Sequence, residues 1–66
     1  MAAPAARVLK YRLKKDLSQV AFGNQAQLSD ALISLIERGK SPITARSAKR
    51  LARVMGVSWP NLVTTE

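Results

Sequence analysis

LSDALISLIERGK, residues 28–40, combines a helix start, an apolar helical period and a helix stop in one short segment. Ser29 is suited to the N-cap position, because a serine hydroxyl accepts a hydrogen bond from a free backbone N–H at a helix start. Ile33 and Ile36 follow at the spacing of one helix face. Gly39 favours the left-handed conformation that often ends a helix. The segment therefore predicts a short amphipathic helix with one face available for contacts.

The composition indicates a small, strongly basic protein that lacks the usual catalytic side chains. Its 66 residues include eleven Lys and Arg against four Asp and Glu, which gives a net charge of +7. Such a charge favours a polyanionic partner, most often nucleic acid. The absence of Cys and His excludes disulfides, Cys-rich zinc sites and mechanisms that need a Cys nucleophile or a His base. We therefore expect a binding protein that is not an enzyme.

Membrane insertion and secretion are not indicated by the sequence. No apolar run approaches the length of a membrane-spanning helix, and the opening MAAPAAR is too short and too weakly apolar for a secretory signal. A basic amphipathic helix can also lie on anionic lipid, but the apolar stripe within residues 8–17 is short and interrupted by Arg12. We therefore expect a cytoplasmic protein with no membrane partner.

The N-terminal part of the chain predicts an arm followed by a first helix. Residues 1–6 are mostly small side chains around Pro4 and are expected to form a flexible arm, with the first helix beginning near Ala5 and residues 7–66 making up a single domain. The segment VLKYRLKKDL, residues 8–17, runs without Gly or Pro and predicts an amphipathic helix. Its apolar side consists of Val8, Leu9, Leu13 and Leu17, and its basic side of Arg7, Lys10, Lys14 and Lys15.

Ser18 predicts the cap of a second helix over residues 19–26. Gly23 allows two interpretations, since glycine inside a helix costs about 1 kcal/mol relative to alanine. Either the backbone of another helix comes close there, or the helix is broken at Gly23 and Asn24. A break would start the second helix at Asn24 and merge it with the segment that follows. The apolar residues of the predicted helix are Val20 and Phe22.

A fourth helix and a short last turn are predicted in the C-terminal part. After the loop KSPI, residues 40–43, Thr44 is suited to cap a helix that Gly56 ends. Ser58 caps a last turn with Pro60 near its start. No period-2 run indicates a strand, so the predicted fold class is all-α, a compact bundle of five short helices. The fourth helix would bury Ala48, Leu51, Ala52 and Met55 and leave Arg46, Lys49, Arg50 and Arg53 on a solvated face, with Trp59, Leu62 and Val63 closing the core.

Two short helices joined by a brief connection, residues 19–26 and 29–38, fit the helix-turn-helix unit. The segment LSQVAFGNQAQLSDALISLIERGK, residues 17–40, and the following SPITARSAKRLARVMGVS, residues 41–58, resemble the XRE-type helix-turn-helix domain of phage repressors, Cro proteins and restriction-modification controller proteins. The resemblance covers about Val8–Val63. It implies a repressor-like five-helix bundle without catalysis or cofactor. It also implies a bacterial or phage-encoded, nucleoid-associated transcription regulator that binds double-stranded DNA as a homodimer on an inverted-repeat operator.

The resemblance assigns roles to individual residues at matching positions. Arg12 and Glu37 match a buried ion pair that links the first helix to the end of the third. Gln19 matches a phosphate contact that also orders the recognition helix, residues 29–38. The other DNA-binding positions that the resemblance implies lie on or just after this helix: Ser29, Asp30, Ala31, Ser34 and Leu35 facing the groove, and Arg38, Lys40 and Ser41 contacting phosphate.

The expected groove-reading face has few hydrogen-bonding groups. Sequence readers usually place Arg, Lys, Asn or Gln against base edges, whereas Asp30, Ala31, Ser34 and Leu35 offer no bidentate contact to a purine. Asp can accept from cytosine N4, and Ala or Leu can pack on a thymine methyl. Asp30 is equally suited to the first helical turn, where the helix dipole favours an acid. Leu35 allows three interpretations: a thymine contact, a protein contact, or a helix whose phase differs from the predicted one.

Gln27 is a second departure from the family pattern, which usually has Gly in the turn between the two helices. A left-handed turn at this position costs Gln about 1 kcal/mol, because its side chain meets a clash that glycine avoids.

Two further functions and a self-association surface are hypotheses from the sequence. Leu32 and Leu35, if exposed, suit a protein partner, as in an antitoxin-like interaction module with secondary DNA binding. Single-stranded RNA binding is less favoured, because the chain has one Trp, one Tyr and one Phe, and two of them are needed in the core. Trp59 is either a core residue or part of a dimer interface. The apolar residues expected at a C-terminal dimer interface are Ile43, Val57, Trp59 and Val63.

Overall fold

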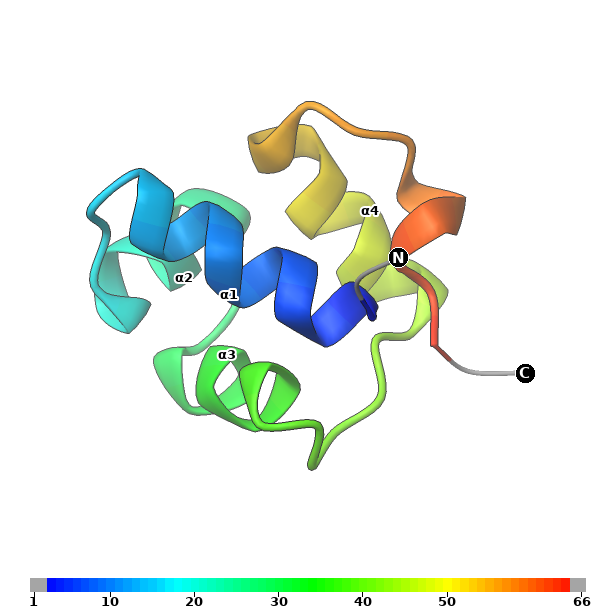
Figure 1. Cartoon of the computed structure of the whole chain (residues 1–66), viewed down its shortest axis with the longest axis horizontal. Helices are drawn as coiled ribbons and strands as arrows, with labels where there is room; N and C mark the ends of the chain where they lie inside the picture. The colour runs from blue at the N-terminus through cyan, green and yellow to red at the C-terminus, as the bar shows by residue number, and fades with distance from the viewer. Residues whose placement is uncertain (1–2, 65–66) are drawn as a thin grey trace.

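Four α-helices and one 3-10 helix make up the residues that the structure, a computed structural model, describes: 3–64. In Figure 1, α1 crosses the middle of the molecule, with α3 below it and α4 above it. The all-α class is therefore confirmed, whereas the expected fifth α-helix is a 3-10 helix. The elements are α1 (Pro4–Lys14), α2 (Gln19–Ala26), α3 (Asp30–Glu37), α4 (Ala45–Met55) and η1 (Trp59–Leu62).

The last element is a 3-10 helix because its sequence, WPNL, is short and contains a proline. Pro60 occupies its first turn and has no N–H to donate to the chain before it. The chain returns to an extended conformation at Val63, with φ −69° and ψ 130°. A run of four residues with a proline is more compatible with one tight turn than with an α-helix.

α1 begins earlier than the expected domain boundary at residue 7. Pro4 starts the helix, where its fixed φ is favourable and its missing N–H would have no intrahelical partner. The N–H of Arg7 donates to the carbonyl of Ala3 at 3.0 Å and closes the first turn. The segment expected as a flexible arm is therefore helical from Pro4 onward, and residues 1–2 of that arm lie outside the described residues.

Three N-caps and two glycine stops set the helix ends where the sequence predicts them. The side-chain oxygens of Ser18, Ser29 and Thr44 accept hydrogen bonds of 3.0, 3.1 and 3.2 Å from backbone N–H groups in the first turns of α2, α3 and α4. Gly39 and Gly56, after α3 and α4, both have φ of 72°, the left-handed conformation that favours glycine. These local signals therefore set the bounds of α2, α3 and α4, whereas Ser58, also expected as a cap, makes no side-chain cap hydrogen bond at η1.

The core is built from residues of every element, so no helix is stable without the others. Tyr11 extends it between α1 and α4: its hydroxyl donates to the carbonyl of Val54 at 3.0 Å, and its ring centroid lies 5.9 Å from that of Phe22. α2 packs on both α3 and α4. The buried apolar residues are Val8, Phe22, Ala26, Ile33, Ile36, Ile43, Ala48, Leu51, Ala52 and Leu62.

Two residues expected on apolar helix faces are exposed, so their assignment to the core is wrong. Leu13 is 61% exposed and Val20 is 55% exposed. At about 100° per residue, Leu13 lies about 140° around the helix from Val8, and Val20 lies about 160° from Phe22. The core-facing direction of each helix is fixed by Val8 and Phe22, which are completely buried. Both exposed residues therefore belong to the opposite faces.

Ile43 and Trp59 differ from the expectations that Ile43 is a dimer contact and that Trp59 closes the core. Ile43 is 1% exposed, and its backbone is fixed by two hydrogen bonds with Thr64, of 2.7 and 2.9 Å. It is therefore a core residue and not a dimer contact. Trp59, in contrast, is 38% exposed and lies with its ring centroid 4.9 Å from the Nζ of Lys49, on the outer side of α4. The completely buried residue of this segment is Leu62.

The turn between α2 and α3 is tight and left-handed. Gln27 has φ 59° and ψ 41°, so a residue other than glycine occupies the left-handed region. Gly23 meets the carbonyl oxygen of Leu28 so closely that an added Cβ would overlap it, and the position of that Cβ would lie 3.4 Å from the N of Asp30. α2 is continuous through Gly23. The close approach is therefore confirmed, but the approaching backbone is mainly the turn leading into α3 and not the body of another helix.

Replacing Gln27 with glycine is expected to stabilise the protein. Glycine adopts the left-handed conformation without a side-chain clash, and the gain is about 1 kcal/mol after its greater freedom in the unfolded chain is included. The midpoint of urea unfolding measures the change, with Asn24→Gly, in the middle of α2, as the control that should destabilise. A lower midpoint for Gln27→Gly would contradict the role given to the left-handed turn.

Candidate nucleic-acid interface

α3 buries one face and exposes the other over its full length. Ile33 and Ile36 are completely buried, whereas Asp30, Ala31 and Leu35 are exposed, Leu35 by 38%. Because both isoleucines point into the core, the helix has the predicted phase, and the exposure of Leu35 is a property of the fold. The same face also carries Ser34, which is half-buried, and is preceded by the exposed N-cap Ser29.

Leu32 does not share the exposure of Leu35. It is half-buried and packs against the core. The pair of exposed leucines on which the protein-interaction hypothesis depended is therefore reduced to Leu35 alone.

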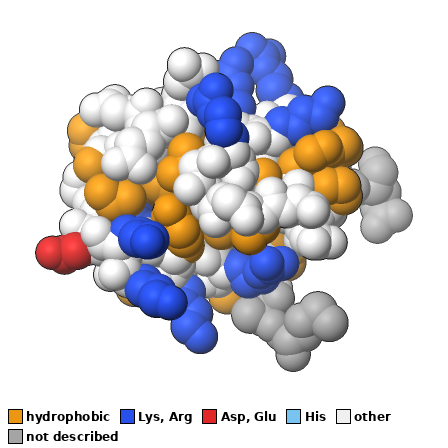
Figure 2. Space-filling view, turned by 90° about the horizontal axis from the view of Figure 1, so that it is seen from above, with side chains coloured by type: hydrophobic (Ala, Val, Ile, Leu, Met, Phe, Trp, Pro, Cys, Tyr) orange, Lys and Arg blue, Asp and Glu red, His pale blue; other side chains and the backbone are white. Residues whose placement is uncertain are grey.

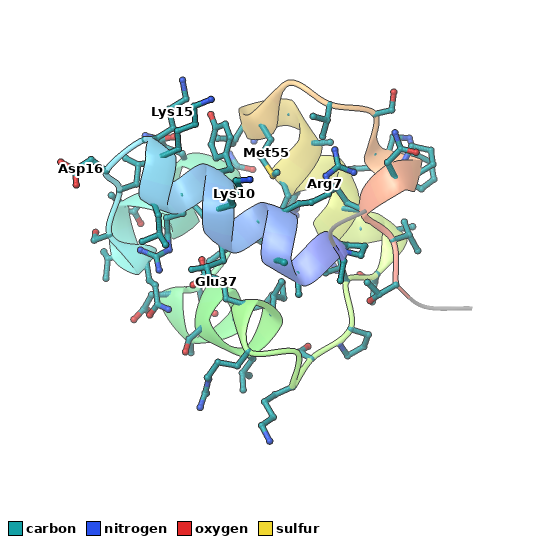
Figure 3. All side chains as sticks on the ribbon, viewed as in Figure 1. Arg7, Lys10, Lys15, Asp16, Glu37 and Met55 are labelled. Carbon is teal, nitrogen blue, oxygen red and sulfur yellow. The ribbon has the colours of Figure 1, made fainter. Side chains whose placement is uncertain are left out.

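A buried ion pair fixes the C-terminal end of α3 against α1. Arg12 Nε donates to Glu37 Oε2 at 2.7 Å, and Arg12 Nη2 donates to Glu37 Oε1 at 3.0 Å. The exposed fractions of the two side chains are 13% and 4%. In Figure 3, Glu37 lies between α3 and α1, whereas Lys15 and Asp16 are at the far end of α1. The ion pair implied by the family resemblance is formed, with the two-pronged geometry that makes arginine–carboxylate contacts strong.

Two more hydrogen bonds extend this ion pair to α2. Arg12 Nη1 donates to the carbonyl of Leu17 at 2.9 Å, and Gln19 Nε2 donates to Glu37 Oε1 at 3.2 Å. The hydrogen bond to Glu37 raises the pKa of the Arg12 guanidinium above its ordinary value, against the desolvation that lowers it. Arg12 therefore stays charged, and the ion pair connects α1 with α3 directly and with α2 through Gln19. Gln19, at the start of α2, takes part in ordering α3.

The residues after α3 supply positive charge beside its exposed face. Arg38, the C-cap, and Lys40 are both exposed. Arg38 Nε donates to the carbonyl of Ser34 at 3.4 Å, and the N–H of Lys40 donates to the carbonyl of Leu35 at 2.9 Å. Both cations are therefore anchored to the last turn of α3. Ser41 is half-buried, with its hydroxyl 3.5 Å from the carbonyl of Pro42.

Positive charge also covers surfaces away from α3. Figure 2 views the molecule from above, the side opposite α3, and shows Lys and Arg side chains spread among apolar ones, with an acidic group at the edge. The charge distribution alone does not select one binding face. In residues 3–64, no helix combines the length and apolar character needed to cross a membrane.

One polar contact at this site was not predicted from the sequence. Arg50, expected on the solvated face of α4, donates from Nη1 to the carbonyl of Gln27 at 2.8 Å. Helical spacing places Arg50 beside other cations and carries no information about a turn that is distant in the sequence. Only the packing of α2 on α4 brings the two residues together.

Two helices joined by a tight turn, with the second exposed along one face and flanked by cations, define a DNA-binding helix-turn-helix protein. The chain belongs to the helix-turn-helix family, whose model matches residues 8–62. The family resemblance inferred from the sequence is therefore confirmed. Among the curated proteins, none matches this sequence.

Three solved structures share the fold. The P22 c2 repressor protein, in complex with synthetic operator 9T in the presence of Tl⁺, has a TM-score of 0.83, 21% identity and 100% coverage of both chains. The restriction-modification controller protein C.AhdI from Aeromonas hydrophila has a TM-score of 0.78, 22% identity and 89% coverage of both. SinR, the master regulator for biofilm formation, solved in complex with DNA, has a TM-score of 0.75, 24% identity and coverage of 89% of this chain and 95% of its own.

Removing the carboxylate of Glu37 is expected to unfold the protein or weaken it severely. Glu37→Ala leaves Arg12 buried without its counter-charge, at a cost of about 3–5 kcal/mol, which is most of the stability of a domain this small. Thermal unfolding followed by circular dichroism measures the loss. Glu37→Gln, which keeps the shape and one acceptor oxygen, should lose less. An unchanged melting temperature for Glu37→Ala would show that the ion pair does not contribute to stability.

Proposed function

We propose that this protein is a sequence-specific transcription regulator that binds double-stranded DNA as a homodimer, with α3 in the major groove of an inverted-repeat operator. The observation that carries the proposal is the exposed face of α3. The Arg12–Glu37 ion pair holds this helix against α1, and cations lie at its C-terminal end. An α-helix fits the major groove, and helix-turn-helix proteins place their second helix there.

The phosphate contacts that we propose lie at both ends of the helix pair. Arg38 and Lys40 are exposed after α3 and can reach the backbone on one side of the groove. Gln19 would contact a phosphate from the start of α2 while its amide also bonds Glu37. Ser41 is the remaining residue of this set, whereas Ser29 belongs to the positions that we propose to face the groove. Such contacts position the protein on DNA and supply affinity without reading sequence.

The base contacts that we propose are mostly apolar. Ala31 and Leu35 are separated by one helical turn and are both exposed, so they form a small apolar surface suited to thymine methyl groups. Ser34 can bond either member of a base pair. Asp30 is in the first turn of α3, where the helix dipole stabilises it, and it can accept from cytosine N4. We infer an operator with thymines at the positions that face Ala31 and Leu35.

Homodimerisation is supported by apolar surface at the C-terminal end of the described residues. Trp59 is 38% exposed, and Val57 and Val63 are half-buried beside the core. Two copies related by a two-fold axis would present two α3 helices to the half-sites of an inverted repeat. The P22 c2 repressor, which has this fold, was solved on an operator, and SinR was solved on DNA.

Binding to a selected operator is expected to be specific and strongly dependent on salt. The duplex is obtained by selection from a random pool, and its affinity is measured by fluorescence anisotropy between about 50 and 200 mM salt. Each phosphate contact contributes about −0.9 to the slope of log K against log salt. Lys40→Met should make that slope shallower by about one per subunit, equally for all duplex sequences. Sedimentation should give two chains per duplex. No preference over random duplex would contradict sequence-specific regulation.

A second prediction isolates the apolar base contact. Replacing the facing thymines with deoxyuridine removes only the methyl groups, and should weaken binding about threefold to fourfold per contact, the value of one buried methyl-sized group. Leu35→Ala should lose the discrimination between thymine and uracil at the position that faces Leu35, keep it at the position that faces Ala31, and keep the salt slope. Discrimination that persists in Leu35→Ala at the position that faces Leu35 would assign the contact to another residue.

A further inference from the structure

Arg50, in the middle of α4, connects that helix to the turn between α2 and α3. Its Nη1 donates a hydrogen bond of 2.8 Å to the backbone carbonyl of Gln27, which is 23 residues away in the sequence. Arg50 is half-buried, whereas the other cations of α4 (Arg46, Lys49 and Arg53) are exposed. Of the cationic residues that helical spacing places on the outer side of α4, Arg50 is therefore the one directed at the helix-turn-helix unit.

The carbonyl that Arg50 binds belongs to the residue that ends α2. The backbone N–H groups of Gln27 and Leu28 both donate to the carbonyl of Gly23, the latter at 2.8 Å, and so close the turn from inside. The carbonyl of a C-cap residue lies beyond the intrahelical bonds, so a side chain or water has to supply its partner. A cationic donor at a helix C-terminus is also favoured by the helix dipole. The Arg50 guanidinium supplies both the hydrogen-bond donor and the positive charge at this end of α2.

The hydrogen bond from Arg50 is made to a residue, Gln27, in an unfavourable backbone conformation. Its left-handed conformation, φ 59° and ψ 41°, is one that a glutamine side chain disfavours and a glycine adopts freely. The turn therefore has to be held by contacts from outside, because its own sequence does not prefer it. Arg50 bonds the residue whose conformation is the unfavourable one.

The position of α3 depends directly on this turn. The carbonyl of Leu28 lies against Gly23 with no room for a Cβ, and the N of Asp30 lies 3.4 Å from the same point. A change in the dihedral angles of Gln27 would therefore move the first turn of α3 relative to α2. Ala31, the next residue of the exposed face, would move with it.

We propose that Arg50 is a positioning residue of the recognition unit: its hydrogen bond to the Gln27 carbonyl holds the left-handed turn and so sets the orientation of α3 on α2. The effect on DNA binding rests on the proposed function, whereas the effect on the turn does not. A cation at this place has one competing role, a direct contact to a DNA phosphate, and the two roles differ in their salt dependence.

The first experiment is a double-mutant cycle on stability, which needs no DNA. R50M removes the donors but keeps an unbranched side chain, and R53M, an exposed arginine on the same helix, is the charge-matched control. R50M is expected to lower the melting temperature by about 4–8 °C, while R53M stays within about 3 °C of the parent. In the Q27G background, the R50M shift should fall to less than half, because a glycine turn does not depend on the bond.

Three results of this cycle would overturn the proposal. They are an R50M shift no larger than that of R53M, an R50M shift that is the same in both backgrounds, and a larger R50M shift in the Q27G background. If R50M alone does not fold, R50K, which keeps the charge and one donor group, is measured in both backgrounds, and its shift should again be smaller with Q27G.

The second experiment measures DNA affinity on the selected operator at temperatures where each variant is folded. R50M should bind about threefold to tenfold more weakly with an unchanged slope of log K against log salt, and Q27G/R50M should return to within about twofold of Q27G. A slope lowered by about one per subunit, without rescue by Q27G, would make Arg50 a phosphate contact and overturn the proposal. Absence of specific binding by the parent protein would overturn the proposed function, and the stability cycle would still decide the role of Arg50.

Discussion

The buried contact between Arg12 and Glu37 is the interaction on which the arrangement of the first three helices depends. Burying two charges is expensive, and their attraction offsets that cost only where the remaining hydrogen-bonding groups are satisfied. Here the two-pronged contact is completed by the carbonyl of Leu17 and the amide of Gln19. In the part of the chain that the structure describes, each buried side-chain N or O atom of a residue that is not exposed has a hydrogen-bond partner. The two-pronged geometry tolerates little displacement, so the ion pair fixes the end of α3 relative to α1.

The turn between α2 and α3 is a second constraint, at the other end of the recognition helix. Gly23 permits the close approach of the Leu28 carbonyl, and Gln27 takes a conformation that its side chain disfavours. The ion pair thus fixes the end of α3, and the turn fixes its beginning. Because α3 is only eight residues long, constraints at both ends leave its exposed face little freedom, which is what a surface that reads another molecule requires.

Local chemistry made the helix boundaries predictable, whereas contacts between distant residues were only partly predictable. The caps at Ser18, Ser29 and Thr44 depend on neighbouring backbone atoms, so the sequence carries the whole signal. The Arg12–Glu37 pair was accessible only through the family resemblance, because a spacing of 25 residues has no local meaning. Helical periodicity also leaves open which of two apolar directions is buried, and this is why Leu13 and Val20 were misplaced. The exposed face of α3 was predicted because two adjacent isoleucine positions determined its phase.

If α3 reads DNA as proposed, its exposed face would recognise a site more through close apolar contact than through hydrogen bonds. Positive charge over much of the surface gives affinity for any duplex, including at faces other than that of α3 (Figure 2). In the function proposed above, specific binding would have to come from contacts that tolerate little displacement, since Ala31 and Leu35 would gain from a thymine methyl only in van der Waals contact. A long arginine can adjust to a shifted helix, but a short apolar side chain cannot. A reading face of this kind therefore requires a more rigid support than a polar one, and the ion pair and the clamped turn provide it.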